Sequence, residues 1–200
     1  MRDFKKSILA TTLALIVGYM PAVAQNKKTK LLLAEIAGSW QLDASNAVTY
    51  QLIADVPGAT AAQLYDRSLD YLGKNYTKAD HSITTQDPDR QQLAGRGIFA
   101  GIHRGSLPEI NLDTWHTIRI DTKENRARIT ITIAEYFRDQ DLGLGREVGD
   151  IPIASQYPIN EKGMYKNQYG RAFVASHQAA TQRLQAVADY LTSSPTSKDW

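Results

Sequence analysis

The run from Arg126 to Arg138 constrains the fold most, because apolar and polar side chains alternate along it with a period of two. Alternation of this length predicts a β-strand with one face on a hydrophobic core and the other face in solvent. The side chains predicted to point into the core are Ile129, Ile131, Ile133 and Phe137. The side chains predicted to point outward are Arg128, Thr130, Thr132 and Tyr136. Such a strand requires a sheet that is covered on one face and open on the other.

Weaker patterns of the same kind predict four more strands, with a helix after the first of them. The strands are expected at 48–56, 81–86, 93–104 and 115–121, and the Gly-, Pro- and Asn-containing stretch 105–112 is predicted to be a loop. Thr60 and Gln63 have the spacing of a capping box, which predicts a helix that runs to about Tyr76. The side chains of Leu64, Leu72 and Tyr76 are expected to face the sheet.

A second helix is predicted over 168–191, where residues of one stripe recur every three or four positions. The stripe consists of Phe173, His177, Ala180, Leu184, Val187 and Leu191. Residues 139–163 lack periodicity and are predicted to be a long loop, which either carries function or wraps over the fold. The predicted fold class is α+β: strand, helix, four strands, helix, with the helices on one face of a curved antiparallel sheet.

The chain divides into a single α+β domain over 48–193, an N-terminal segment at 25–47 and a polar tail at 194–200. Within the N-terminal segment, the basic stretch 26–30 is expected to be mobile. The apolar stretch 31–36 fits either one helical turn or an edge segment of the sheet.

The first 24 residues have the pattern of a secretory signal peptide, with basic residues, then an apolar run, then Ala22-Val23-Ala24. We therefore predict export to the periplasm, the cell envelope or beyond, with a mature form that starts near Gln25. No later apolar run is long enough to span a membrane. Basic and acidic residues balance after Gln25, so no bulk charge favours nucleic acid as a partner. The chain has no cysteine, which excludes disulfides and a thiol nucleophile.

Three motifs resemble an uncharacterised family of exported bacterial proteins, a domain of unknown function with a TATA-binding-protein-like fold. They are VTYQLIADVPGATAAQLYDRSLDYLGKNY at 48–76, GRGIFAG at 95–101 and ARITITIAEYF at 127–137. The resemblance covers about 48–138 and implies the fold and an exported location. It brings no activity, cofactor or catalytic residue with it, and the fold alone does not imply DNA binding.

Motifs for catalysis and metal binding are weak. The four histidines, His81, His103, His116 and His177, are scattered. His103 and His116 lie on strands that are expected to be neighbours and could approach each other, but no third ligand stands at metal spacing. His177 is expected to pack against the core, and Ser106 lacks the glycine pattern of a nucleophile elbow. We therefore predict no metal, no cofactor and no catalytic residue.

Two further motifs have simpler structural interpretations. Asp139-Gln140-Asp141, followed by Glu147 and Asp150, resembles a calcium loop only faintly, because Gly143 stands where an EF-hand needs a ligand. A solvated turn is expected there. The glycines of Gly95-Arg96-Gly97 do not form a dinucleotide fingerprint and are expected to mark a bulge or to let a helix pack closely on the sheet.

The open sheet face is the predicted binding surface, because exposed aromatic side chains beside arginines are typical of contact surfaces. Its residues are Trp115, Thr117, Arg119, Arg128, Thr130 and Tyr136. The alternative is a plain solvated face, or one covered by the 139–163 loop.

The leading functional hypothesis is a non-catalytic envelope protein that binds a protein or a small molecule at this face or in the cleft under its helices. The second hypothesis is a carrier of a small apolar ligand, with a cavity between the C-terminal helix and the sheet. The third is a hydrolase whose site is assembled from the 139–163 loop. The sequence does not identify the partner or the oligomeric state.

Overall fold

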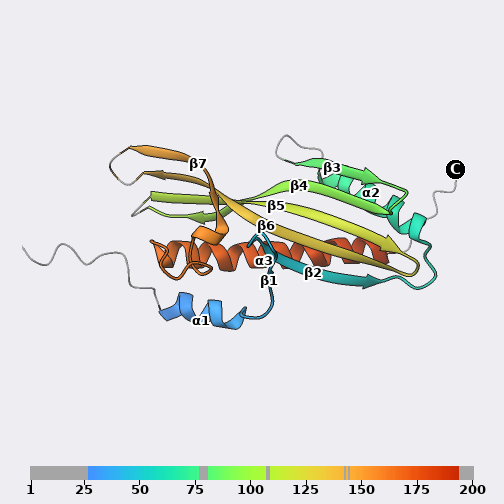
Figure 1. Ribbon diagram of the computed structural model, residues 1–200, viewed down its shortest axis with the longest axis horizontal. Coiled ribbons are helices and arrows are strands. Elements are labelled where there is room, and N and C mark those ends of the chain that lie inside the picture. Colours follow the sequence, from blue (N-terminus) through green and yellow to red (C-terminus); the bar gives the residue numbers. More distant parts are fainter. Residues whose placement is uncertain (1–26, 77–80, 107–108, 142, 144, 194–200) are drawn as a thin grey trace, which may run out of the picture.

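The computed structural model describes residues 27–76, 81–106, 109–141, 143 and 145–193, and these form a twisted sheet with helices packed along one side (Figure 1). The predicted signal peptide at 1–24 and the polar tail at 194–200 lie outside the described residues.

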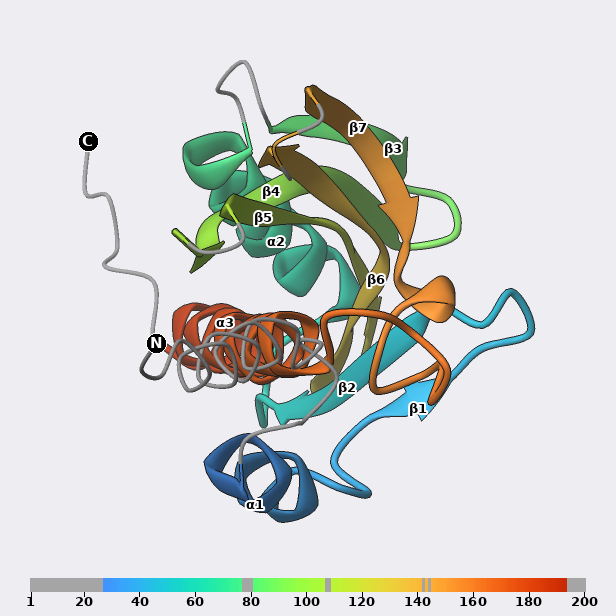
Figure 2. The same ribbon diagram turned by 90° about the vertical axis from the view of Figure 1, so that its left-hand side faces the viewer.

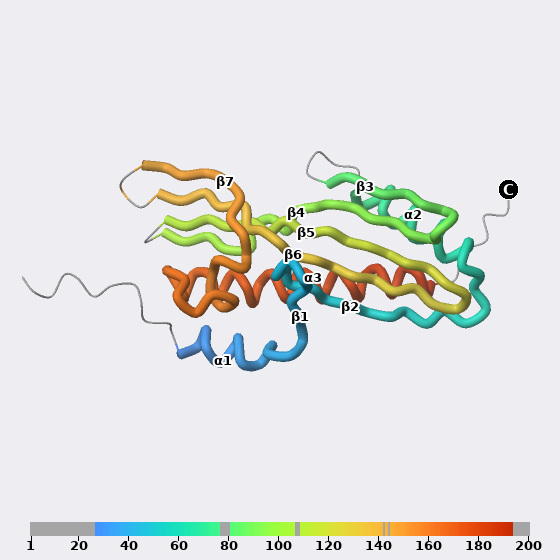
Figure 3. Tube along the Cα trace, in the orientation of Figure 1, coloured from blue at the N-terminus to red at the C-terminus, as the bar shows by residue number. Residues whose placement is uncertain are grey.

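The sheet is antiparallel throughout, and its long strands are the central ones. The strands are β1 (Gln41–Leu42), β2 (Val48–Asp55), β3 (Ser82–Asp87), β4 (Gln92–Arg104), β5 (Glu109–Lys123), β6 (Arg126–Asp141) and β7 (Arg146–Pro152). Their order is β1-β2-β6-β5-β4-β3, and β7 also pairs with β6. β2 pairs with β6 as far as Ile133, and β7 pairs with β6 from Glu135 onward, so two strands share one edge of β6 (Figure 3).

The helices are α1 (Lys27–Glu35), α2 (Ala61–Asn75) and α3 (Lys166–Thr192), and a short 3-10 turn, η1, spans Ile153–Ser155. α2 and α3 lie together on the concave side of the sheet, as the end-on view shows (Figure 2). Leu64, Leu72 and Tyr76 are buried there, as the helical spacing predicts. The predicted α+β architecture, with helices on one face of a curved antiparallel sheet, is therefore confirmed.

The N-terminal segment is more ordered than its composition suggests. Residues 27–35 form α1, which packs on α3 through the buried side chain of Thr29. The Thr29 hydroxyl donates a hydrogen bond of 2.6 Å to Asn167 Oδ1. A Cβ at Gly170 of α3 would lie 2.6 Å from the Thr29 methyl carbon, so this glycine permits the close contact. Residues 27–30, part of the start that was expected to be mobile, form the first turn of α1, and Gly170 leaves room for this helix to dock on α3.

A β-bulge in β6 corrects the predicted orientation of its second half. Trp115 pairs with Glu135 and Thr117 with Thr132, so His116 alone faces two β6 residues, Ile133 and Ala134. The extra residue reverses the in–out alternation beyond it. Tyr136 is therefore fully buried and not on the open face, and Phe137 lies on the opposite side from the one predicted.

Two predicted loops contain strand. β5 begins at Glu109, and its side chains Ile110 and Leu112 are fully buried, so the predicted 105–112 loop was too long. In the predicted 139–163 loop, Asp139–Asp141 continue β6, and β7 runs over Arg146–Pro152. β7 shows no alternation because it is an edge strand with both faces largely exposed.

The capping box of α2 yields the first testable prediction. The Thr60 hydroxyl accepts a 3.1 Å hydrogen bond from the Gln63 N–H, and Gln63 Oε1 accepts a 2.9 Å bond from the Thr60 N–H. Thr60→Ala removes one of these bonds and should lower the free energy of unfolding by about 0.5–2 kcal/mol in urea denaturation. Thr60→Ser keeps the hydroxyl and is the matched control, so equal losses in both variants would contradict the role of the cap.

Candidate functional site

Five of the six residues predicted for the binding surface share the outer face of the sheet. Thr117, Arg119 and Arg128 are exposed there, and Trp115 and Thr130 are half-buried. Tyr136 lies on the opposite, buried face because of the bulge.

The charged and aromatic groups of this face are paired within the molecule. Arg119 and Arg128 both donate to the Asp121 carboxylate. Partial burial opposes ionisation of that carboxylate, but these bonds and one from Gln92 keep the pKa of Asp121 below its usual value. The Trp115 indole N–H donates a 2.9 Å hydrogen bond to Asp150, and the Arg96 guanidinium lies 4.3 Å from its ring centroid. A partner at this face would have to break these contacts.

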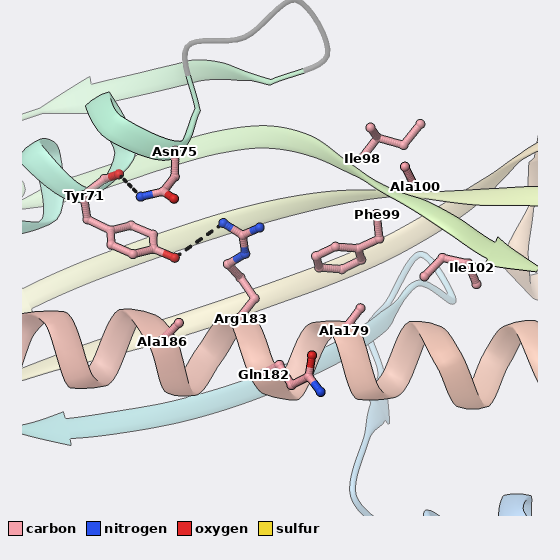
Figure 4. Close-up of a pocket in the computed structure, with 10 residues that line it drawn as sticks. All are labelled: Tyr71, Asn75, Ile98, Phe99, Ala100, Ile102, Ala179, Gln182, Arg183 and Ala186. Carbon is pink, nitrogen blue, oxygen red and sulfur yellow. Dashed lines mark hydrogen bonds between the residues drawn. The ribbon is translucent and has the colours of Figure 1, made fainter.

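The concave side carries a groove of about 540 Å³ between α3, β4 and the end of α2 (Figure 4). This volume is in the usual range for small-molecule sites. Most of the residues that line it are apolar, but the surface that they expose to the groove is more polar than apolar; the lining residues are Tyr71, Asn75, Ile98, Phe99, Ala100, Ile102, Ala179, Gln182, Arg183 and Ala186. β3 pairs with β4 only up to Arg96. Beyond Arg96, β4 pairs with β5 alone among the described strands, and the groove lies beside this part of β4.

Arg183 is the one charged residue among the described residues that line the groove. Its side chain leaves α3 and points across the groove toward α2, where Nη1 lies 3.4 Å from the Tyr71 hydroxyl (Figure 4). The guanidinium also lies 5.6 Å from the centroid of the Tyr76 ring. No carboxylate in the described part of the chain forms a salt bridge with it. These two contacts, with a hydroxyl and with a π-face, carry no full negative charge, so this half-buried cation is suited to an anionic ligand group.

A buried aromatic cluster supports the groove from behind. Phe99 stacks on the ring of His116, with centroids 3.8 Å apart and planes at 8°. His116 Nε2 lies 2.8 Å from the Tyr76 hydroxyl. Burial lowers the pKa of His116 to about 3, and the charges of Arg183 and His81 act in the same direction. His116 is therefore a neutral packing group behind the Phe99 wall.

The glycines of β4 have the packing role that the sequence indicates. A Cβ at Gly95 would lie 3.0 Å from the Tyr76 ring, so the end of α2 approaches the strand closely there. A Cβ at Gly97 would lie 2.4 Å from His81 Cδ2 and 2.9 Å from His116 Cε1. The absence of these side chains leaves space for the aromatic cluster.

The histidines pair differently from the prediction. His116 lies beside His81, with ring centroids 6.2 Å apart, and not beside His103, which pairs with Leu112 further along the strand. His177 packs near the Tyr50 ring, as expected for a core-facing position. In the described residues, no three His, Asp or Glu side chains gather in a way that could hold a metal ion.

The acidic residues of the faint calcium motif are spread along the β6–β7 hairpin. Asp139 pairs with Arg146, and Glu147 pairs with Arg138. Asp150 accepts its hydrogen bond from Trp115, so each of these carboxylates has a partner of its own. The described part of the motif therefore forms a hairpin with cross-strand pairs.

Sequence reasoning placed a possible cavity between the C-terminal helix and the sheet but named none of its residues. Arg183 falls outside the α3 stripe that faces the core, and Phe99 lies in a glycine-punctuated strand. The groove forms where α2 ends, at Asn75. Near Phe99 and beyond it, the inner side of β4 faces α3 and is no longer covered by α2. No local pattern reports that arrangement.

The low pKa of His116 predicts an acid-sensitive fold. Between pH 6.5 and about 3 the unfolded chain binds a proton that the folded chain does not, so stability falls as pH drops below 6.5. One such group contributes at most about 1.4 kcal/mol per pH unit. The lowered pKa values of His103 and His177 act in the same direction. Urea denaturation across this range should show a shallower pH dependence in His116→Gln than in the parent chain.

The comparison variant is His103→Gln, which removes a half-buried histidine outside the aromatic cluster and should flatten the pH profile less than His116→Gln does. Parallel pH profiles for the parent chain and His116→Gln would show that His116 does not titrate between its folded and unfolded values as argued.

Comparisons with known proteins agree with the fold. A family model described as "Domain of unknown function (DUF4468) with TBP-like fold" matches residues 50–137. A crystal structure of a DUF4468 family protein from Bacteroides ovatus is similar, with a TM-score of 0.59 and 16% identity over 80% of this chain and 94% of that chain. A TBP-like protein from Parabacteroides distasonis has a TM-score of 0.55 and 9% identity over 74% and 96% of the two chains. No curated protein matches. Residues 50–137 are thus a domain of the DUF4468 family, and the chain has its TBP-like fold.

Proposed function

We propose that this protein is a non-catalytic binding protein of the cell envelope that holds a small amphipathic anion in the groove between α3 and β4. The anionic group, most simply a carboxylate, lies against Arg183, and the apolar part lies along Phe99 and Ile102. The proposal combines two sequence-based hypotheses, a cleft under the helices and a carrier site beside the C-terminal helix.

The observation that carries the proposal is the environment of Arg183. A half-buried guanidinium gains most from a charged acceptor, and the described chain supplies none within salt-bridge distance. Its planar set of N–H donors matches the two oxygens of a carboxylate. Tyr71 and Asn75, at the α2 side of the groove, add a hydroxyl and an amide that can hydrogen-bond the same group.

The apolar residues of the groove indicate the chemistry of the part of the ligand that lies away from Arg183. Ala179 and Ala186 lie one helical turn on either side of Arg183 and form a low, smooth wall on α3. The side chains of Phe99 and Ile102 form the wall on β4, whereas the Ile98 side chain points away from α3 (Figure 4). The apolar side chains along this groove suit the hydrocarbon part of an amphipathic ligand, and burial of methylene groups would supply much of the affinity.

Export of the protein is the second part of the proposal and follows from the signal-peptide pattern of residues 1–24. None of the helices within the described residues is long and apolar enough to cross a membrane. Nucleic acid is not the proposed partner, since basic and acidic residues balance outside the leader.

The outer sheet face is a weaker candidate for binding. Its arginines share Asp121, and its tryptophan is held between Arg96 and Asp150. These internal pairs leave few free groups for a partner, whereas the groove cation has no internal acid in the described chain.

Isothermal titration calorimetry with decanoate tests the proposed function. The parent chain should bind decanoate, and decanol, which lacks the charge, should bind at least tenfold more weakly. Arg183→Gln removes a hydrogen bond to a charged group, worth about 1.5–3 kcal/mol, and should weaken decanoate binding about tenfold to a hundredfold. Arg183→Lys keeps the charge without the planar donor set and should fall between the two.

The matched control is Arg119→Gln, which removes an arginine from the outer face and should leave decanoate binding unchanged. The proposal fails if the parent chain does not bind decanoate, or if Arg183→Gln binds it as tightly as the parent chain does.

A further inference from the structure

The outer face of the sheet carries charges of opposite sign on its two halves. β5 and β6 run side by side along the length of the sheet, and every second residue of each strand points to this face (Figure 1). On the half that contains the β5–β6 turn, the charged residues of this set are four cations and one carboxylate: Arg119, Asp121, Lys123, Arg126 and Arg128. On the half beyond the bulge they are five carboxylates and no cation: Glu109, Asp113, Glu135, Asp139 and Asp141.

The basic half ends in two exposed cations, Lys123 and Arg126, which lie directly opposite each other in the β5–β6 ladder. Like charges in that position destabilise a sheet. Within the described residues neither forms a salt bridge, although Asp55 of β2 is the cross-strand neighbour of Arg126. The nearby carboxylate of Glu124 accepts a hydrogen bond from the Ala61 N–H at the start of α2. This end of the face therefore keeps an excess of positive charge.

The acidic half ends in a second like-charge pair, Glu109 and Asp141, which are exposed and directly opposite each other. No salt bridge in the described part of the chain includes either of them. Arg146 pairs with Asp139, and its pKa is raised first by that bond and then by Glu109 and Asp141, so three carboxylates share one arginine. Two other carboxylates have partners on β4: Arg96 pairs with Glu135, and Arg104 with Asp113. This end therefore keeps an excess of negative charge.

Two exposed apolar side chains on the same face lie at equal distances from the bulge. Ile53 of β2, 55% exposed, is paired with Arg128, and Val148 of β7, 59% exposed, is paired with Asp139. Arg128 lies five positions before Ile133, and Asp139 lies five positions after Ala134, where the bulge is. Because β2 and β7 share one edge of β6, a two-fold axis through the bulge and across the strands superimposes the place of Ile53 on that of Val148.

We propose that the outer face binds a second copy of this chain in a two-fold dimer, with the strands of the two sheets antiparallel. Lys123 and Arg126 of each copy face Glu109 and Asp141 of the other, and Ile53 of each copy packs on Val148 of the other. The dimer uses the charges that internal pairing leaves over, so the pairs around Asp121 stay intact. Two-fold dimers bring the same patch of both copies together, and aligned packing of two sheet faces is a common arrangement.

The size of the face is sufficient for such a dimer. β6 has 16 residues and extends about 50 Å, and a strip three strands wide along it measures roughly 15 Å across. The resulting area, roughly 750 Å² per copy, is close to the about 800 Å² per partner of a standard protein interface.

Sedimentation equilibrium of the full mature chain, residues 25–200, tests the proposal. In about 0.05 M salt the parent chain should dimerise with a Kd below about 100 μM, and about 0.5 M salt should weaken the dimer at least tenfold because it screens surface charges. Two double variants each reverse one end: Lys123→Glu with Arg126→Glu, and Glu109→Lys with Asp141→Lys. Each variant alone should self-associate at least tenfold more weakly, because like charges then meet at both ends of the interface.

An equimolar mixture of the two variants should restore the dimer, because each reversed end then meets an end of opposite charge. Thermal unfolding checks that each variant is folded, and a mixture of the single variants Lys123→Glu and Glu109→Lys replaces any double variant that is not. The groove lies on the inner side of the sheet, so decanoate binding should be the same in the variants as in the parent chain and reports on the groove alone. The dimer proposal is overturned if the parent chain is monomeric at low salt, if the reversed variants dimerise as tightly as the parent, or if the mixture stays monomeric.

Discussion

The bulge in β6 is the feature on which the rest of the structure depends. Before it, the inward side chains Ile129, Ile131 and Ile133 are fully buried and form an apolar bed for the helices. After it, the inward positions carry Tyr136, then Arg138 and Gln140. One extra residue opposite His116 therefore divides the concave face into an apolar half and a polar half.

α3 spans both halves, because 27 residues of helix extend about 40 Å. Over the polar half its first turns meet Tyr136 and the 155–165 segment, and Tyr169 packs 5.8 Å from the Tyr136 ring. Over the apolar half it faces β4 across the groove that contains Arg183. The Phe99–His116–Tyr76 cluster, for which Gly97 leaves space, holds the back wall of that groove.

The sequence predicts this architecture well where local chemistry decides it, and less well where tertiary contacts decide it. The capping box at Thr60 and the alternation before Ile133 define α2 and the centre of the sheet, and the structure confirms both. One residue in the sequence indicates the bulge: Glu135 stands at a position that strict alternation would bury. No sequence pattern indicates the groove, because the surroundings of Arg183 form only when α2, β4 and α3 pack together. β7 was missed because an edge strand needs no apolar face.

A crystal structure of the chain with decanoate tests the central claim most directly, namely that the groove between α3 and β4 holds an amphipathic anion. The account predicts electron density for the carboxylate within hydrogen-bonding distance of the Arg183 guanidinium, with the hydrocarbon chain along Phe99 and Ile102. An empty groove at saturating decanoate, or a ligand bound elsewhere with Arg183 unengaged, would contradict it.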